Sequence, residues 1–267
     1  MKRLAVVGTG YVGLVSGAMF ASVGNHVTCV DKDSSIVDAL RNGKSTIHEP
    51  GLEEILRNAI ADGTLHFTTD TAAAVEHADA AFIAVGTPSL ESGAYDFQYV
   101  EDAAREIGRA LSGDRRYFVV LKSTVTPDIY TRVQEILEKE TAVSGAEFEV
   151  LSNPEFLAEG TAIRDFAQPH RVIAGVVSQE AHEFMEALYT PFTKRKAGLL
   201  QFTDPKSAIV TKLAANSFLA CRVALDQRTG PLLRCDAVGA DIECVRTGLA
   251  SDPRIGQHFL YAGPGFG

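Results

Sequence analysis

The turn between the first apolar stretch and the first helix-like stretch constrains the fold more than any other feature of this sequence. Residues 3–7 form a short apolar run that reads as a buried strand, and residues 11–23 have a helical composition. Gly8, Gly10 and Gly13 form a G-x-G-x-x-G turn at this junction. In a dinucleotide-binding unit the first glycine makes the turn, the second admits the pyrophosphate, and the third lets helix and strand pack closely. The junction therefore predicts a dinucleotide site.

The end of the next expected strand supports the same prediction. Residues 26–30 read as a strand, and Asp31 follows them, 23 residues after Gly8. This spacing is close to the roughly 20 residues expected for an acidic residue that binds the ribose. The carboxylate can accept hydrogen bonds from the 2′-hydroxyl and repels a 2′-phosphate, which favours NAD over NADP. The alternative is a glycine-rich turn with a surface aspartate; the following Lys32 is expected to be solvated.

Strand-like and helix-like segments then alternate along the chain. Further strands are predicted over 65–68, 80–85, 117–121, 147–151 and 171–177, and helices over 51–61, 70–78, 97–111, 128–140 and 179–189. This alternation predicts an α/β fold of the Rossmann type, a mostly parallel sheet with helices on both faces.

The pattern changes after about residue 203, where no further strand is predicted. We expect an NAD-binding Rossmann-type domain over residues 1–203 and a helical central or dimerisation domain over 204–267. Asp204–Ala224 reads as one helix, because Asp204 is a good N-cap and a proline follows it.

Two more helices are expected in the C-terminal part, near 232–238 and over 241–249. Gly230-Pro231 is expected to interrupt any longer helix, since proline removes a hydrogen bond and clashes with the preceding turn.

Composition and charge exclude several classes of function. The net charge is −9 and the densest basic run is Lys194–Lys196, so nucleic acid is not an expected partner. The apolar run Leu4–Val7 is too short for a signal peptide or a membrane span. Cys29, Cys221, Cys235 and Cys244 lack a metal-type spacing, so we expect reduced thiols, no metal site and a cytoplasmic protein without membrane contact.

Two carboxylates lie close together downstream of the dinucleotide turn. Within Asn153–Gly160, Glu155 and Glu159 are four residues apart beside a turn. Such a pair near a dinucleotide site suggests oxidation chemistry. Lys212 and Asn216 are also four apart, which places them on one face of the predicted helix. Taken singly, this pair is more often a solvated helix face.

Seven short motifs together resemble the UDP-glucose/GDP-mannose 6-dehydrogenases along nearly the whole chain. They are Gly8–Gly13 with Tyr11-Val12, Glu49–Leu52, Val85–Pro88, Lys122–Val125, Asn153–Gly160, Lys212 to Asn216, and Asp252–Gly256. Each is short, but their order and spacing are specific. The segment Asp252–Gly267 resembles the UDP-glucose branch of the family more than the GDP-mannose branch.

The resemblance implies a four-electron oxidation of a sugar C6 alcohol to a carboxylate with two NAD. The alcohol becomes an aldehyde, a cysteine thiolate traps it, and the thioester formed after the second oxidation is hydrolysed. By similarity, Glu155 is the acid/base, Lys212 and Asn216 stabilise oxyanions, and Thr124 orients a water. Without the resemblance, Ser123-Thr124 could simply cap the following helix.

The same resemblance assigns the binding residues. The cofactor is expected to contact Gly8, Gly10, Tyr11, Val12, Gly13, Asp31, Thr87, Pro88, Ser123, Thr124 and Glu159. UDP-glucose is expected to contact Glu155, Phe156, Leu157, Glu159, Lys212, Asn216, Arg254, Phe259, Leu260, Tyr261, Gly263 and Gly267. The full-length family is expected to form a homodimer, with Arg254 reaching the sugar either within one subunit or across the interface.

The sequence departs from the family pattern in two main places. The family's glycine loop continues into a Gly-Ser-Cys segment with the nucleophilic cysteine, whereas this sequence ends at Gly267. We therefore expect a chain truncated before the catalytic cysteine. Such a chain is expected to bind NAD without forming uronate. Leu225–Pro231 is about two residues longer than its family counterpart and helix-breaking, which puts the dimer packing in question.

Two rival hypotheses remain open from the sequence. One is a dehydrogenase of the 3-hydroxyacid or 6-phosphogluconate type, which uses a lysine and an asparagine without a thiol. The other is a catalytically inactive NAD-binding subunit that pairs with a full-length partner. The segments Asn153–Gly160 and Asp252–Gly267 favour the nucleotide-sugar branch over the first rival.

Overall fold

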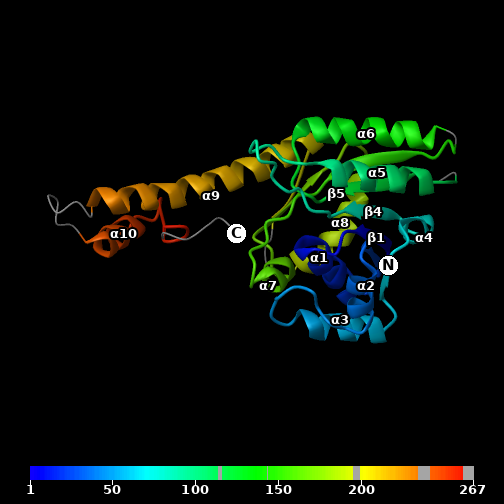
Figure 1. Ribbon diagram of the computed structural model, residues 1–267, viewed down its shortest axis with the longest axis horizontal. Coiled ribbons are helices and arrows are strands. Elements are labelled where there is room, and N and C mark those ends of the chain that lie inside the picture. The colour runs from blue at the N-terminus through cyan, green and yellow to red at the C-terminus, as the bar shows by residue number, and fades with distance from the viewer. Residues whose placement is uncertain (114–115, 143, 195–198, 234–240, 261–267) are drawn as a thin grey trace. The chain divides into compact units, whose positions relative to one another are not determined.

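The computed structural model describes residues 1–113, 116–142, 144–194, 199–233 and 241–260 (Figure 1). The chain divides into two compact units, Met1–Lys212 and Leu213–Gly267. The division falls inside one long helix, and the domain boundary near residue 203 stays a prediction.

The first unit is built on one sheet of eight strands in the order β3-β2-β1-β4-β5-β6-β7-β8. The strands are β1 (Arg3–Val7), β2 (His26–Val30), β3 (Leu65–Thr68), β4 (Ala80–Ile83), β5 (Tyr117–Leu121), β6 (Phe148–Ser152), β7 (Arg171–Gly175) and β8 (Leu199–Thr203). Neighbouring strands are parallel, except that β6 and β7 meet antiparallel at Ser152 and Gly175. The predicted mostly parallel sheet is confirmed.

Helices cover both faces of this sheet, as predicted. Figure 1 shows α5 and α6 along one face and α1 with α3 along the other. The helices are α1 (Tyr11–Ser22), α2 (Ser34–Arg41), α3 (Leu52–Ala61), α4 (Thr71–Glu76), α5 (Gln98–Ala110), α6 (Pro127–Thr141), α7 (Ala162–Ala167), α8 (Gln179–Thr193), α9 (Pro205–Leu233) and α10 (Ile242–Ala250).

An aromatic cluster fixes α1 against the sheet and against α7 and α8. The ring of Phe20 is fully buried, and its centroid lies 5.4 Å from that of Phe82 and 5.3 Å from that of Phe166. Tyr189 and Phe192 of α8 complete the cluster, at 5.6 and 6.4 Å from Phe20. Tilted and edge-on rings at these separations add to the stabilisation from area burial. The cluster therefore holds the helix that follows the glycine turn.

Three elements of the first unit were not predicted. Helix α2 begins after Asp33, whose carboxylate caps the amide of Ser35. Helix α7 has six residues, fewer than periodicity can reveal. Strand β8 pairs with β7 and lies between a basic run and the polar Asp204, so the sequence offers only a short apolar signal for it.

The predicted interruption at Gly230-Pro231 is wrong, because α9 continues to Leu233. A 29-residue helix has many internal hydrogen bonds, so the loss at one proline near its end is tolerated. The predicted start is confirmed, since Asp204 Oδ1 accepts the amide of Ser207 at 2.9 Å. Helix α10 confirms the prediction over 241–249, whereas most of 232–238 lies outside the described residues.

Candidate functional site

The glycine turn has the geometry that a bound dinucleotide needs. Gly8 has φ of +100°, and a Cβ added there would lie 2.6 Å from the carbonyl oxygen of Ala84. A Cβ on Gly13 would lie 1.9 Å from the Gly8 carbonyl oxygen, so α1 packs directly on the turn. Gly10, the N-cap of α1, has open space around it and provides no side-chain cap. The first amides of α1 lack intrahelical acceptors and can bind phosphate, so these residues fit a dinucleotide.

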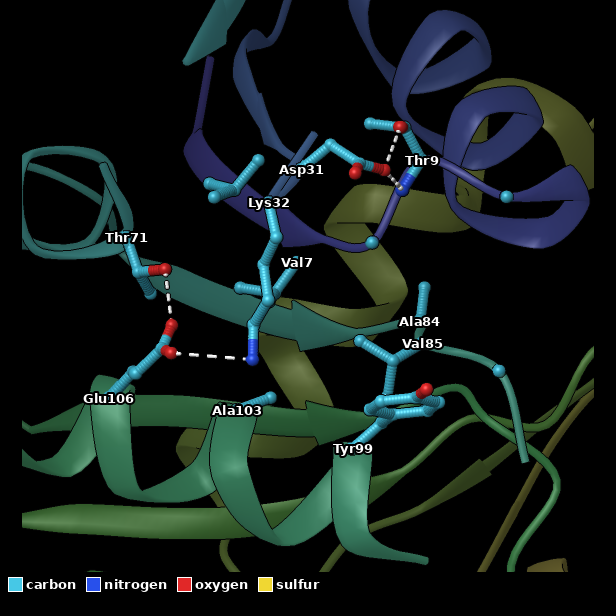
Figure 2. Close-up of a pocket in the computed structure, with 14 residues that line it drawn as sticks. Val7, Thr9, Asp31, Lys32, Thr71, Ala84, Val85, Tyr99, Ala103 and Glu106 are labelled. Atoms are coloured by element: carbon cyan, nitrogen blue, oxygen red, sulfur yellow. Dashed lines mark hydrogen bonds and ion pairs between the residues drawn. The ribbon is translucent and has the colours of Figure 1, made fainter. Parts of the chain in front are cut away.

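A cavity of about 200 Å³ opens beside this turn (Figure 2). It lies at the carboxyl ends of β1, β2 and β4, where the strand order reverses between β1 and β4. Open α/β sheets bind ligands at such a switch point. The lining residues are Val7, Gly8, Thr9, Gly10, Val30, Asp31, Lys32, Thr71, Ala84, Val85, Gly86, Tyr99, Ala103 and Glu106.

Two carboxylates border the cavity. Asp31 Oδ2 accepts the amide of Thr9 at 3.2 Å and also the Thr9 hydroxyl, which fixes the carboxylate beside the glycine turn. Glu106 accepts the hydroxyl of Thr71 at 2.7 Å, and Lys32 Nζ lies 3.7 Å from its other oxygen, as Figure 2 shows. Lys32 is two-thirds exposed and is directed at Glu106. Negative charge at this border disfavours an additional phosphate on the ribose 2′-hydroxyl of the dinucleotide.

The predicted cofactor residues are only partly gathered around the cavity. Gly8, Gly10 and Asp31 line it, and Thr87 and Pro88 follow the lining residues on the same loop. Ser123 is nearby in the fold, since its hydroxyl donates to the carbonyl of Val85 at 2.7 Å. Val12 lies in the first turn of α1, Thr124 is half-buried after Ser123, and Glu159 is exposed.

Sequence reasoning missed the lining residues that α4 and α5 provide. Thr71 begins α4 directly after β3 and its loop, and Tyr99 and Ala103 share one face of α5 with the four-residue helical spacing. The sequence signal that could have revealed Thr71 was the start of a helix after a parallel strand.

A second cluster lies at the carboxyl end of β6. Lys212 Nζ donates to Glu155 Oε1 at 2.8 Å, and the two side chains are only 8% and 14% exposed. Glu155 Oε2 accepts the amide of Leu157 at 2.6 Å. The ring of Phe156 lies 5.4 Å from Lys212 Nζ, within cation–π range. The fold thus brings together the two predicted catalytic residues Glu155 and Lys212, which are far apart in the sequence.

Lys122 is a third charge in this region, and its role was not predicted. It is 3% exposed, and its ammonium donates to Asn153 Oδ1 at 3.1 Å and to the Tyr189 hydroxyl at 3.4 Å. Among the residues that the structure describes, no carboxylate lies within 4 Å of it. Burial lowers the pKa of Lys122 to about 8, against an opposing effect of Glu155 and a reinforcing effect of Lys212. The signals in the sequence were a lysine directly after an apolar strand and its place at the start of the motif Lys122–Val125.

The Tyr11 hydroxyl connects the glycine turn to the loop after β6. It donates to Glu49 Oε2, and the amide of Gly160 donates to both the hydroxyl oxygen, at 2.7 Å, and Glu49 Oε2, at 2.9 Å. Glu49 Oε1 accepts the amide of Ile163 at 3.3 Å. Burial and the Glu49 carboxylate raise the pKa of Tyr11 to about 12.

The remaining predicted substrate residues belong to the second unit. Asn216 is half-buried on α9, one turn after Lys212, and Arg254 is exposed and pairs with Asp252 at 2.6 Å. Phe259 has φ of +60°, and Leu260 is buried. The predicted Tyr261, Gly263 and Gly267 lie outside the described residues.

Within the described residues, no helix has the length and apolar character needed to cross a membrane. No group of three or more His, Cys, Asp or Glu side chains in the same part of the chain is arranged to hold a metal ion.

Known proteins match the chain along its whole length. The NAD binding domain of the UDP-glucose/GDP-mannose dehydrogenase family matches residues 2–193, and the central domain of that family matches residues 206–267. UDP-glucose 6-dehydrogenase of Pseudomonas aeruginosa PAO1 is 43% identical over 99% of this chain, and UDP-glucose 6-dehydrogenase TuaD of Bacillus subtilis 168 is 42% identical over 100%. The structure of a UDP-glucose dehydrogenase from Pyrobaculum islandicum superposes with a TM-score of 0.92 at 39% identity over 100% of this chain.

This chain spans 58% and 56% of the two curated relatives and 60% of the solved structure. The matched NAD binding domain covers the glycine turn and the cavity beside it, which identifies NAD as the cofactor of this site. The resemblance drawn from the short motifs is confirmed. The chain belongs to the UDP-glucose/GDP-mannose dehydrogenase family.

Proposed function

We propose that the protein oxidises the C6 alcohol of UDP-glucose to the carboxylate of UDP-glucuronate with NAD. The observation that carries this proposal is the buried Glu155–Lys212 ion pair, 2.8 Å long, at the edge of the sheet that also bears the NAD cavity. The names of the relatives support the nucleotide sugar as substrate. Because the chain spans less than two thirds of those relatives, the activity of the whole protein is part of the proposal.

The ion pair provides two of the groups that this chemistry needs. Glu155 is the acid/base, since a carboxylate can take a proton from a hydroxyl or activate a water. Lys212 places a positive charge where negative charge develops on the sugar oxygen, and Asn216 adds a neutral donor on the next turn of α9. NAD, when bound, supplies the electron acceptor for each oxidation. Thr124 is proposed to orient a water near the reacting carbon.

The sugar nucleotide is proposed to bind through residues that follow each member of the ion pair in the sequence. Phe156, Leu157 and Glu159 follow the acid/base on its loop, and Arg254 and Phe259 follow α10. The preference for UDP-glucose over GDP-mannose, a homodimeric assembly and a cytoplasmic location complete the proposal.

The test uses the chain completed with the family's C-terminal part, which carries the thiolate that traps the aldehyde, and measures NADH and uronate formed from UDP-glucose and from GDP-mannose. Two NADH for each uronate and a higher kcat/KM for UDP-glucose are expected. Glu155→Gln should lower uronate formation at least a hundredfold, as removal of an acid/base does, whereas Glu135→Gln, a change of an exposed carboxylate on α6, should leave it unchanged. A higher kcat/KM for GDP-mannose would contradict the choice of substrate, and an unaffected Glu155→Gln variant would contradict the role of the ion pair.

A further inference from the structure

The motif Glu49-Pro50-Gly51-Leu52 has no part in the function argued so far, yet its carboxylate is buried. Glu49 is 7% exposed and lies in the loop before α3, outside both the cavity and the ion pair. A buried carboxylate is costly unless hydrogen bonds or charges compensate it. Its compensation comes from donors in two distant segments of the chain.

Those donors belong to the two segments that build the candidate site. The Tyr11 hydroxyl comes from the first turn of α1, directly after Gly10. The amides of Gly160 and Ile163 come from the end of the loop that carries Glu155 and from the start of α7. One carboxylate therefore bonds the dinucleotide turn and the active-site loop at the same time.

The Gly160 amide is held by two acceptors in this arrangement. Gly160 has φ of +82° and no side chain, so it contacts Tyr11 and Glu49 through its backbone amide. Its amide is shared between the Tyr11 oxygen, at 2.7 Å, and Glu49 Oε2, at 2.9 Å. Removing the carboxylate leaves the Ile163 amide without its acceptor and the Gly160 amide with the phenol alone. A buried donor that loses its acceptor destabilises the local structure.

We propose that Glu49 is a positioning residue that ties the dinucleotide-binding turn to the loop bearing Glu155 and Glu159, so that dinucleotide binding orders this loop. Binding at the first turn of α1 restrains Tyr11, and Tyr11 restrains Gly160 through the shared carboxylate. The reciprocal effect follows, because a loop already held in place makes binding at the turn more favourable. The coupling to NAD rests on the proposed function, whereas the tether itself does not.

Hydrogen exchange of the 267-residue chain tests the tether without any ligand. In Glu49→Gln one acceptor oxygen becomes an NH2 donor, so the amide that faces it loses its acceptor. Exchange should speed up at least tenfold at Gly160 or Ile163 and stay unchanged at the amides of β1 and β4. Tyr11→Phe should have a smaller effect on Gly160 and none on Ile163, and it remains informative if Glu49→Gln fails to fold. The control is Glu54→Gln, an exposed carboxylate at the start of α3, which should change neither amide. Unchanged exchange in both test variants would overturn the tether.

The same experiment with NAD tests the coupling. NAD should slow exchange over residues 155–163 in the unsubstituted chain (the parent) and in Glu54→Gln, and this protection should be lost in Glu49→Gln. Calorimetry should give NAD a three- to tenfold higher Kd in Glu49→Gln than in either of the other two. Equal protection by NAD in Glu49→Gln would overturn the coupling. If the parent does not bind NAD, both the assignment of NAD as the cofactor and the proposed coupling are wrong. The exchange rates without ligand still show whether Glu49 ties the turn to the loop.

Discussion

Asp31 and Lys122 each act through their charge, and the charge of Asp31 is expected to select between NAD and NADP. Its carboxylate is held by Thr9 and shares the border of the cavity with Glu106. We expect the parent to bind NAD at least tenfold more tightly than NADP, and Asp31→Ala to reduce that ratio about tenfold, which corresponds to roughly 1.4 kcal/mol. Calorimetric titration with both dinucleotides measures this. Asp38→Asn, on the exposed face of α2, is the control. A parent that binds NADP as tightly as NAD would refute the role of Asp31.

Lys122 makes stability depend on pH in a predictable direction. Burial lowers its pKa from 10.5 to about 8, and unfolding restores the ordinary value. Below pH 8 both states carry the proton and the cost of burying the charge is fully present. Between pH 8 and 10.5 the unfolded chain binds more protons, so this residue's contribution to stability rises with pH, by up to roughly 3 kcal/mol.

Urea denaturation of the parent and of Lys122→Met at several pH values isolates this contribution. The difference in unfolding free energy between the two proteins should move in favour of the parent from pH 8 to 10.5. The exposed Lys139→Met on α6 should follow the parent at every pH. Parallel curves for the parent and Lys122→Met would mean that the buried amine keeps an ordinary affinity for its proton.

At the scale of elements, the Glu155–Lys212 ion pair joins the loop after β6 to α9. Either partner alone would be a buried charge, so Glu155→Gln should cost about 3–5 kcal/mol of stability. Replacing both, as Glu155→Gln with Lys212→Met, should cost less than Glu155→Gln alone. A double-mutant cycle by urea denaturation measures this, and strictly additive effects would show that the pair does not join the two elements.

The elements also show which parts of the structure the sequence can predict. The fold class and most strands and helices follow from periodicity and from the glycine turn, because these signals are local. The approach of Glu155 and Lys212 came only from the family resemblance, since 57 residues separate them. The contacts of Lys122 and Glu49 were not predicted, because they depend on which side chains meet after packing. Strand β8 was missed for the same reason, as β7 stabilises it.

At the scale of the whole first unit, stability depends on the aromatic cluster around Phe20. Because this ring is fully buried against four other rings, Phe20→Ala should lower the free energy of unfolding by about 3–5 kcal/mol. Phe20→Leu should lower it less, and Phe218→Ala, which alters a ring that is 65% exposed, should change it by about 0.5 kcal/mol or less. Urea denaturation measures all three. A small effect of Phe20→Ala would mean that the cluster repacks freely.

The strand order has a consequence for how the chain is made. Strand β1 lies between β2 and β4, and β4 begins 50 residues after β2 ends. A ribosome that adds about 5–20 residues per second takes roughly 3–10 s to synthesise that stretch. Throughout this interval the apolar β1 can pair with β2 on one side only, and its other edge is open to any neighbouring nascent chain. Crowded polysomes translating this message should therefore be the setting in which the protein most needs a chaperone.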